Sequence, residues 1–123
     1  MAAGKAIGEF SFKAVTVTYS PGPAGSVLAQ ANWEGTATGF GAVFVTATYV
    51  GGPKGGTYSD CSAAYLDNGE GLTGMGQGTT ESIGKHRWRT AGFVHISDGR
   101  RLASEGEIDL ASRSWKGKIS EMS

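Results

Sequence analysis

The sequence has few of the residues that build covalent or metal-held frameworks. It contains one cysteine, Cys61, and two histidines, His86 and His95, among 123 residues. A single cysteine cannot form an internal disulfide, and no cluster of cysteine, histidine and carboxylate side chains has the spacing of a zinc site. The two histidines, nine residues apart on one predicted strand, point to opposite faces. We therefore expect no bound metal and no cofactor.

Long apolar runs and an excess of either charge are also missing. No segment approaches the ~20 apolar residues that span a bilayer, and Met1–Gly8 lacks the apolar stretch of a secretory signal. Eleven basic residues balance eleven acidic ones, which leaves no electrostatic footprint for nucleic acid or an anionic membrane. These absences predict a cytoplasmic protein without nucleic-acid or membrane partners.

Glycine is abundant and proline is scarce. The chain has 21 glycines. It has only three prolines, and these lie between Pro21 and Pro53. Because a glycine in a helix interior costs ~1 kcal/mol relative to alanine, this composition favours strands joined by tight turns. A chain of 123 residues is long enough for one core, so we expect a single domain over residues 1–123.

The first half of the chain alternates between apolar and polar residues. Over 8–19 the apolar parity switches at Ala14-Val15, which predicts a β-bulge. Over 26–38 the alternation places Trp33 on an inward face. The next strand, 40–50, is apolar on both parities, so we expect cover on both sides, for example by a partner subunit in a homo-oligomer. A turn at Gly51–Gly56 then leads to a strand over 57–66.

A glycine row, Gly74, Gly76 and Gly78, follows the turn Asp67-Asn68-Gly69. A two-residue loop at Asn68-Gly69, which this dipeptide favours, pairs the row with Ser59, Cys61, Ala63 and Tyr65. A three-residue loop pairs it instead with Tyr58, Asp60, Ser62 and Ala64. Only the second register turns Asp60 inward.

Three later hairpins supply further registers. A three-residue loop at Ser82-Ile83-Gly84 would place His86 opposite Thr80, Trp88 opposite Gly78 and Thr90 opposite Gly76. Loops at Ser97-Asp98-Gly99 and Ala111-Ser112 pair Trp88 with Ile108 and Ile108 with Trp115, while Arg89 meets Glu107 and Glu105 meets Lys118 on the other face. The apolar set, which includes Leu110, is predicted to face the interior, and the charged set to face solvent.

Eight strands with short connections predict an all-β fold, an eight-stranded antiparallel up-and-down barrel, because closure removes exposed edges. The meander, the length and the glycine-rich hairpins resemble calycin-type barrels, especially bacterial allene-oxide-cyclase-barrel relatives. The lipocalin motif of a glycine one residue before a tryptophan is absent, and the nearest string is Ala31-Asn32-Trp33. The resemblance implies a barrel that holds a small molecule but assigns no catalytic residue.

An interior site for a small apolar or aromatic molecule would use the inward indoles, with an indole N–H as a polar anchor. The candidate ligand-binding residues are Trp33, Trp88, Trp115, Gly74, Gly76, Gly78, Thr90 and Ser104. The structural alternative is that the tryptophans fill the core and the glycines make room for bulky side chains. The glycine row is not a dinucleotide fingerprint, because it leads into a hairpin rather than a helix.

Two residues are candidates for acid–base chemistry. His86 is predicted inward, as a general acid or base or as a structural histidine. Asp60, if inward, would be a carboxyl with a raised pKa in an apolar cavity; if outward, it is an ordinary surface residue. Glu105 and Glu107 are interpreted as salt ladders rather than as a catalytic pair.

Three functions remain open at this stage. The first is a cofactor-free barrel that binds a small apolar or aromatic molecule. The second is a cyclase or isomerase of the allene-oxide-cyclase-barrel type, in which a rigid pocket fixes a reactive conformer. The third is a filled barrel that acts through its outer surface.

Overall fold

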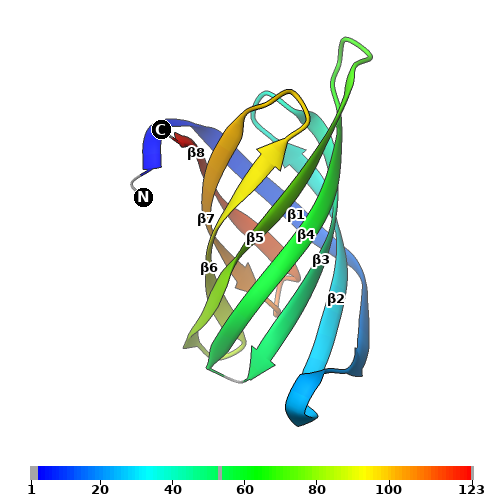
Figure 1. The fold of residues 1–123 in the computed structure, drawn as a ribbon, viewed down its shortest axis with the longest axis vertical. Helices are drawn as coiled ribbons and strands as arrows, with labels where there is room; N and C mark the ends of the chain where they lie inside the picture. The colour runs from blue at the N-terminus through cyan, green and yellow to red at the C-terminus, as the bar shows by residue number, and fades with distance from the viewer. Residues whose placement is uncertain (1–2, 53, 123) are drawn as a thin grey trace.

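A computed structural model describes residues 3–52 and 54–122 and shows a closed antiparallel barrel (Figure 1). Each strand pairs with the next along the chain, and β8 closes onto β1. The predicted all-β, eight-stranded up-and-down barrel is confirmed. The elements are β1 (Ala3–Pro21), a 3₁₀ turn (Pro23–Gly25), β2 (Val27–Ala37), β3 (Gly41–Gly52), β4 (Gly55–Tyr65), β5 (Gly71–Gly84), β6 (Arg87–Ile96), β7 (Arg101–Asp109) and β8 (Ser114–Met122). No helix in the described ranges is long and apolar enough to cross a membrane.

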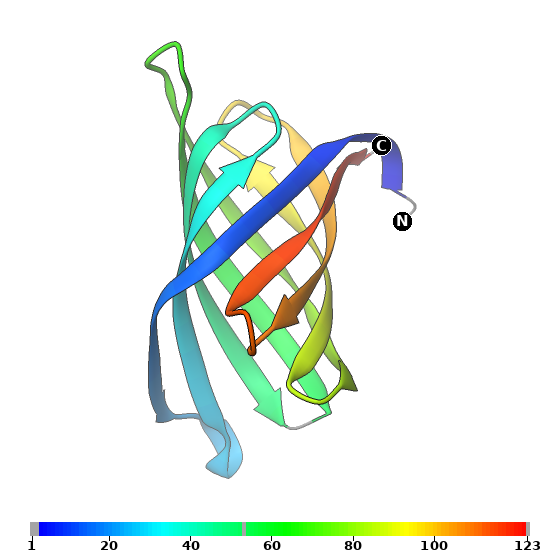
Figure 2. The same ribbon diagram turned by 180° about the vertical axis from the view of Figure 1, so that it is seen from behind.

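The first strand bends at the predicted bulge. Its pairing with β2 shifts between Ala14 and Thr16, which moves its inward residues from one parity to the other. Pairing with β8 ends at Lys13, opposite Ser114. As a result, the second half of β1 and the start of β2 continue past β8 as a projecting hairpin (Figure 2).

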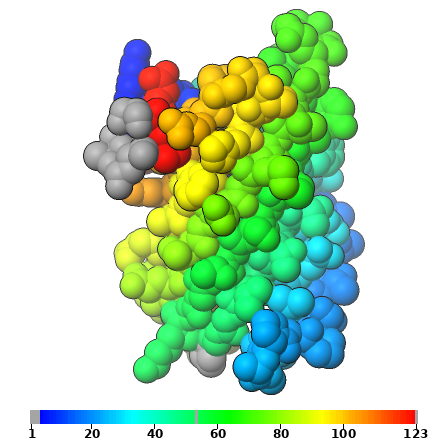
Figure 3. Space-filling view, in the orientation of Figure 1, coloured from blue at the N-terminus to red at the C-terminus, as the bar shows by residue number. Residues whose placement is uncertain are grey.

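Turns gather at the two ends of the barrel. The upper end in Figure 1 carries the β2–β3, β4–β5 and β6–β7 turns, and the lower end carries the other four. The β4–β5 turn rises highest in the space-filling view (Figure 3). Because the topology is up-and-down, alternate turns along the chain lie at opposite ends of the barrel.

Of the three strand registers predicted for the second half of the chain, those of β6–β7 and β7–β8 are confirmed. Trp88 pairs with Ile108 and Arg89 with Glu107 between β6 and β7. Ile108 pairs with Trp115, and Glu105 with Lys118, between β7 and β8. The last turn is longer than predicted, and Leu110 lies in it with 46% of its surface exposed. The prediction that Leu110 lines the interior wall as a strand residue was therefore wrong.

The favoured register between β4 and β5 was wrong, and its alternative is observed. Tyr65 pairs with Gly71, which leaves a loop whose Gly69 has a left-handed φ of 91°. Asp60 consequently pairs with Gly76 and faces inward. This register places Tyr58 and Ala64, both buried, in the core. Their burial outweighs the preference of Asn-Gly for a two-residue type I′ turn.

The predicted β5–β6 register was also wrong, by four residues. Thr80 pairs with Thr90, and Gly78 with Gly92, because β5 continues to Gly84. An even shift keeps every residue on its own face, so the apolar pattern could not reveal the error. His86 therefore lies in the turn, exposed, with a left-handed φ of 59°, and not on the inner wall.

The third strand has one buried face and one exposed face. Val43, Val45 and Ala47 are buried, whereas 46% of Phe44 is exposed on the outer wall, against Tyr65. Strands β3 and β4 also run into the predicted Gly51–Gly56 turn, ending at Gly52 and resuming at Gly55. Pro53 of that turn, and Met1 and Ala2 at the start of the Met1–Gly8 segment, lie outside the described residues.

An aromatic layer crosses the middle of the barrel. Trp115 is its centre, with ring centroids of five neighbours between 5.5 and 6.3 Å away. These neighbours are Phe10, Phe12, Trp33, Tyr49 and Tyr58. Edge-on contacts of this kind stabilise a core beyond the area they bury. The layer leaves space above and below itself.

Candidate functional site

The interior contains two chambers with no lining residue in common. The Asp60 chamber, above the aromatic layer, has a volume of about 110 Å³ and is lined by Asp60, Ser62, Gly74, Ser104 and mostly apolar side chains. The Trp88 chamber, below the layer, has a volume of about 470 Å³ and is lined by Trp33, Tyr49, Trp88 and mostly apolar side chains. The residues predicted to form one site are thus divided between two chambers, and Thr90, Gly76 and Gly78 line neither.

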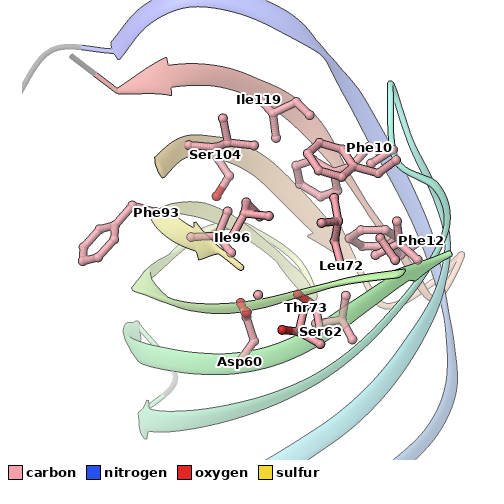
Figure 4. Close-up of a pocket in the computed structure, with 18 of the residues that line it drawn as sticks. Phe10, Phe12, Asp60, Ser62, Leu72, Thr73, Phe93, Ile96, Ser104 and Ile119 are labelled. Carbon is pink, nitrogen blue, oxygen red and sulfur yellow. The ribbon is translucent and has the colours of Figure 1, made fainter. Parts of the chain in front are cut away.

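The polar groups of the Asp60 chamber come from facing walls. Asp60 and Ser62 project from β4 and Ser104 projects from β7 toward the same space, whereas Phe93 points away from it (Figure 4). The remaining surface is apolar, with Val45, Leu102 and Ile119 among the buried contributors. Among the described lining residues there is no lysine, arginine or histidine, so nothing basic neutralises Asp60 inside the chamber.

Burial raises the pKa of Asp60 from 3.8 to about 6, while a hydrogen bond from the Gly76 backbone opposes the rise. The cause is the loss of hydration, which penalises the charged carboxylate. Burial likewise raises the pKa of Tyr58 to about 12, against a hydrogen bond with Ser104. Asp60 therefore changes charge near neutral pH, and Tyr58 remains a neutral phenol.

The glycine row makes room for side chains of the neighbouring strand. A Cβ built on Gly76 would stand 2.9 Å from an Asp60 carboxylate oxygen, and one on Gly74 would stand 2.8 Å from the Ser62 hydroxyl oxygen. A Cβ on Gly78 would stand 2.7 Å from Cε2 of Tyr58. Of the three glycines, only Gly74 lines the chamber. At Gly76 and Gly78, the missing side chain thus makes room for Asp60 and Tyr58 of the neighbouring strand.

The upper mouth of the Asp60 chamber is covered by a turn residue. Phe40, between β2 and β3, is buried and lines the chamber. The guanidinium of Arg100, from the β6–β7 turn, stacks 4.8 Å from the Phe40 ring centroid and pairs with Asp98 at 2.8 Å. A cation on an aromatic face is a stabilising contact, so two turns jointly close this end.

The indole N–H groups of the aromatic layer already have acceptors within the protein. Trp33 Nε1 donates to the Tyr49 hydroxyl at 3.2 Å, and Trp115 Nε1 donates to Thr90 Oγ1 at 3.0 Å. The hypothesis that an indole N–H anchors a ligand therefore does not hold for these two. Thr90 is buried as the partner of Trp115 and lines neither chamber.

The remaining candidates lie outside both chambers. His86 is exposed in the β5–β6 turn and does not reach Asp60 from the interior wall. Glu107 pairs with Arg87 at 2.7 Å on the outer wall, as expected of a salt ladder, although its strand partner is Arg89. Cys61 is exposed. Within residues 3–52 and 54–122, no group of three histidine, cysteine or acidic side chains is placed to hold a metal ion.

Comparison with protein-family models, with curated proteins and with solved structures gives no match for this chain. The chambers themselves are therefore the basis for inferring a function.

Sequence reasoning missed several residues that shape the chambers. Tyr58 and Ser62 were available only through the disfavoured β4–β5 register, and Phe40 was assigned to a strand rather than to a turn. The alternation over 57–66 contained the necessary signal, because Tyr58 and Ala64 share the parity of Asp60. Nothing local in the sequence places Phe40 under Arg100, since that contact joins two turns 60 residues apart.

Proposed function

We propose that this protein is a cofactor-free barrel that binds a small, compact and largely apolar molecule in the Asp60 chamber. The observation that carries the proposal is a carboxyl group facing a mainly apolar cavity without a basic partner there. Ligand pockets combine apolar walls with a few placed polar groups of this kind. The resemblance to calycin and allene-oxide-cyclase barrels points the same way.

The chamber limits the size and charge of the ligand. An apolar cavity of about 150 Å³ in another protein binds benzene, so about 110 Å³ suits a molecule of roughly one six-membered ring. A carboxylate accepts hydrogen bonds and attracts cations. The preferred ligand is therefore a ring-sized molecule with one amine or hydroxyl donor, and an anion of the same size is disfavoured.

A ring-sized probe series tests this proposal directly. Benzylamine, benzyl alcohol and benzoate have similar bodies and differ in charge, so at pH 7.5 we expect affinity to fall in that order. Asp60→Asn should weaken benzylamine binding by about tenfold or more, because a charge-assisted hydrogen bond contributes ~1.5–3 kcal/mol. The matched control is Asp67→Asn, which removes an exposed acid. Titration calorimetry showing that benzoate binds as tightly as benzylamine would contradict the proposal.

The shifted pKa of Asp60 favours a second candidate, a cyclase or isomerase in which Asp60 moves a proton. A group with a pKa of about 6 is suited to general acid–base catalysis near neutral pH. Native mass spectrometry of freshly purified protein would identify a retained small molecule. Asp60→Asn, whose amide oxygen still accepts a hydrogen bond, should keep a neutral ligand and lose only its conversion. If both versions return the molecule unchanged, the binding function alone stands.

A further inference from the structure

The Trp88 chamber is larger than the Asp60 chamber and opens at the lower end of the barrel. Its side chains are mostly apolar, and four apolar ones are exposed at its mouth, which indicates an uncovered apolar entrance. These four are Val17, Tyr19, Val27 and Leu110. The projecting β1–β2 hairpin supplies three of them (Figure 2).

The turns around this entrance carry positive charge. Between the strands at the lower end lie Lys54, Lys85 and Arg113, and no acidic residue occupies the described parts of these connections. Arg113 also lines the chamber. The three connections at the upper end hold three acids, Asp67, Glu70 and Asp98, with one base, Arg100. The described turns at the two ends therefore carry charge of opposite sign, although the protein as a whole is neutral.

Backbone hydrogen bonds fix this basic rim. The carbonyl of Lys54 accepts from Ser82 N at 2.8 Å, and the carbonyl of Arg113 accepts from Ala14 N at 2.9 Å. The carbonyl of His86, the residue that follows Lys85 in its turn, accepts from Leu110 N at 3.1 Å. Each cationic turn is therefore tied to a neighbouring element.

The acids nearest to the rim are already engaged. Glu81 pairs with Arg89 at 3.0 Å and Glu107 pairs with Arg87 at 2.7 Å. Asp109 accepts a hydrogen bond from the Ala111 amide at 2.9 Å. None of the ion pairs found among the described residues uses Lys54, Lys85 or Arg113. All three side chains are exposed, and that of Arg113 lies at the chamber itself.

We infer that the Trp88 chamber is a second binding site, for an amphiphilic anion whose apolar chain enters between Trp33 and Trp88 while its acidic head group stays at the Lys54–Lys85–Arg113 rim. The chamber volume of about 470 Å³ lies within the ~300–1,000 Å³ of small-molecule pockets. This site differs from the Asp60 chamber in both size and charge preference, and it does not depend on the function proposed there.

A head-group series on the wild-type protein is the first test. Decanoate, decanol and decylamine share one chain length and are added below their aggregation concentrations, with tryptophan fluorescence and titration calorimetry as readouts. We expect decanoate to bind about tenfold more tightly than decanol, since each exposed charge contact contributes ~0.2–1 kcal/mol and three are available. Decylamine should bind most weakly. Equal affinities for decanoate and decylamine would overturn the proposal.

Variants locate the two parts of the ligand. The triple variant K54Q/K85Q/R113Q should lose the preference for decanoate over decanol, whereas K5Q/K116Q/K118Q, with the same change in net charge elsewhere, should keep it. Ala29→Trp, which fills the chamber, should abolish binding of both probes, and Ala91→Trp on the outer wall should not. Binding unchanged in a folded Ala29→Trp protein would place the probe elsewhere and overturn the proposal.

Vesicles distinguish a free amphiphile from a lipid surface as the source of the anion. Co-sedimentation with vesicles of phosphatidylglycerol and phosphatidylcholine should be weak, and decanoate binding should be unaffected by their presence. Strong sedimentation that the Ala29→Trp variant retains would show a surface interaction without chain insertion, and would count against the chamber as the site.

Discussion

At the scale of single residues, Asp60 links the chemistry of the upper chamber to the stability of the fold. Its pKa is about 6 in the folded protein against an ordinary value of 3.8. Between these pH values the folded state holds a proton that the unfolded chain has released, so stability falls as pH rises through this window. Above pH 6 both states are deprotonated, and the full penalty of the buried charge persists.

Asp60→Asn should remove this penalty. At pH 7.5 we expect the variant to be more stable than the wild type by about 1–2 kcal/mol, less than the ~3 kcal/mol of the whole shift because Asp60 is partly exposed. Near pH 4 the two proteins should be nearly equal. Urea denaturation at both pH values measures the difference, with exposed Asp67→Asn as the control. A difference that is the same at both pH values would contradict the assignment of the raised pKa.

The glycine row makes a second prediction at this scale. Gly78→Ala puts a methyl group 2.7 Å from both the Tyr58 ring and the Gly92 Cα, so we expect a loss of about 1–3 kcal/mol of stability from overpacking. Gly71→Ala, on the same strand, meets nothing nearer than 3.9 Å and should change stability by less than about 0.5 kcal/mol. Thermal unfolding of both variants measures the difference. If Gly78→Ala is no less stable than Gly71→Ala, packing does not require glycine at position 78.

At the scale of elements, the β2–β3 turn acts as a cover for the Asp60 chamber. Phe40→Ala should cost about 3–5 kcal/mol as a large-to-small core change and should open the upper mouth. In a background where Trp115 is the sole tryptophan, acrylamide quenching of Trp115 should increase several-fold. Arg100→Gln, which removes the stacked cation but leaves the ring, should change the quenching little. Unaltered quenching in a folded Phe40→Ala protein would show that the turn does not cover the chamber.

Elements also show which features the sequence could predict. Alternation and charge pairing sufficed for strand number, closure, the Ala14 bulge and the β6–β7 and β7–β8 registers, because Arg89 and Glu107 lie directly opposite each other. Alternation could not resolve the β5–β6 register, since a shift of four residues preserves both faces. The Glu81–Arg89 ion pair could have indicated the observed register.

The chambers were less predictable than the fold. Three inward tryptophans suggested one aromatic site, yet whether Trp115 and Trp88 share a cavity depends on rings from β1, β3 and β4 that pack around Trp115. Such packing combines strands distant in sequence. The sequence could identify inward residues, but not the layer that divides them.

At the scale of the whole molecule, the turns of the neutral barrel are basic at its lower end and mainly acidic at its upper end. Opposite ends of two copies attract each other, and a head-to-tail contact of this kind does not close into a symmetric dimer. The interaction is long-ranged only when salt is low, because the screening length shortens from ~30 Å at 0.01 M to ~8 Å at 0.15 M ionic strength. Self-association through the ends should therefore depend steeply on salt.

We accordingly expect static light scattering to show attraction between molecules in 10 mM NaCl at neutral pH, and little attraction in 150 mM NaCl. The triple variant K54Q/K85Q/R113Q should remove the attraction, because its lower end no longer complements the acidic turns. K5Q/K116Q/K118Q acquires the same net charge but keeps the basic rim, so part of its attraction should persist. If the two triple variants scatter identically, net charge alone governs association. A salt-independent oligomer would instead indicate apolar contacts on the outer wall, where Phe44 and Tyr65 are exposed.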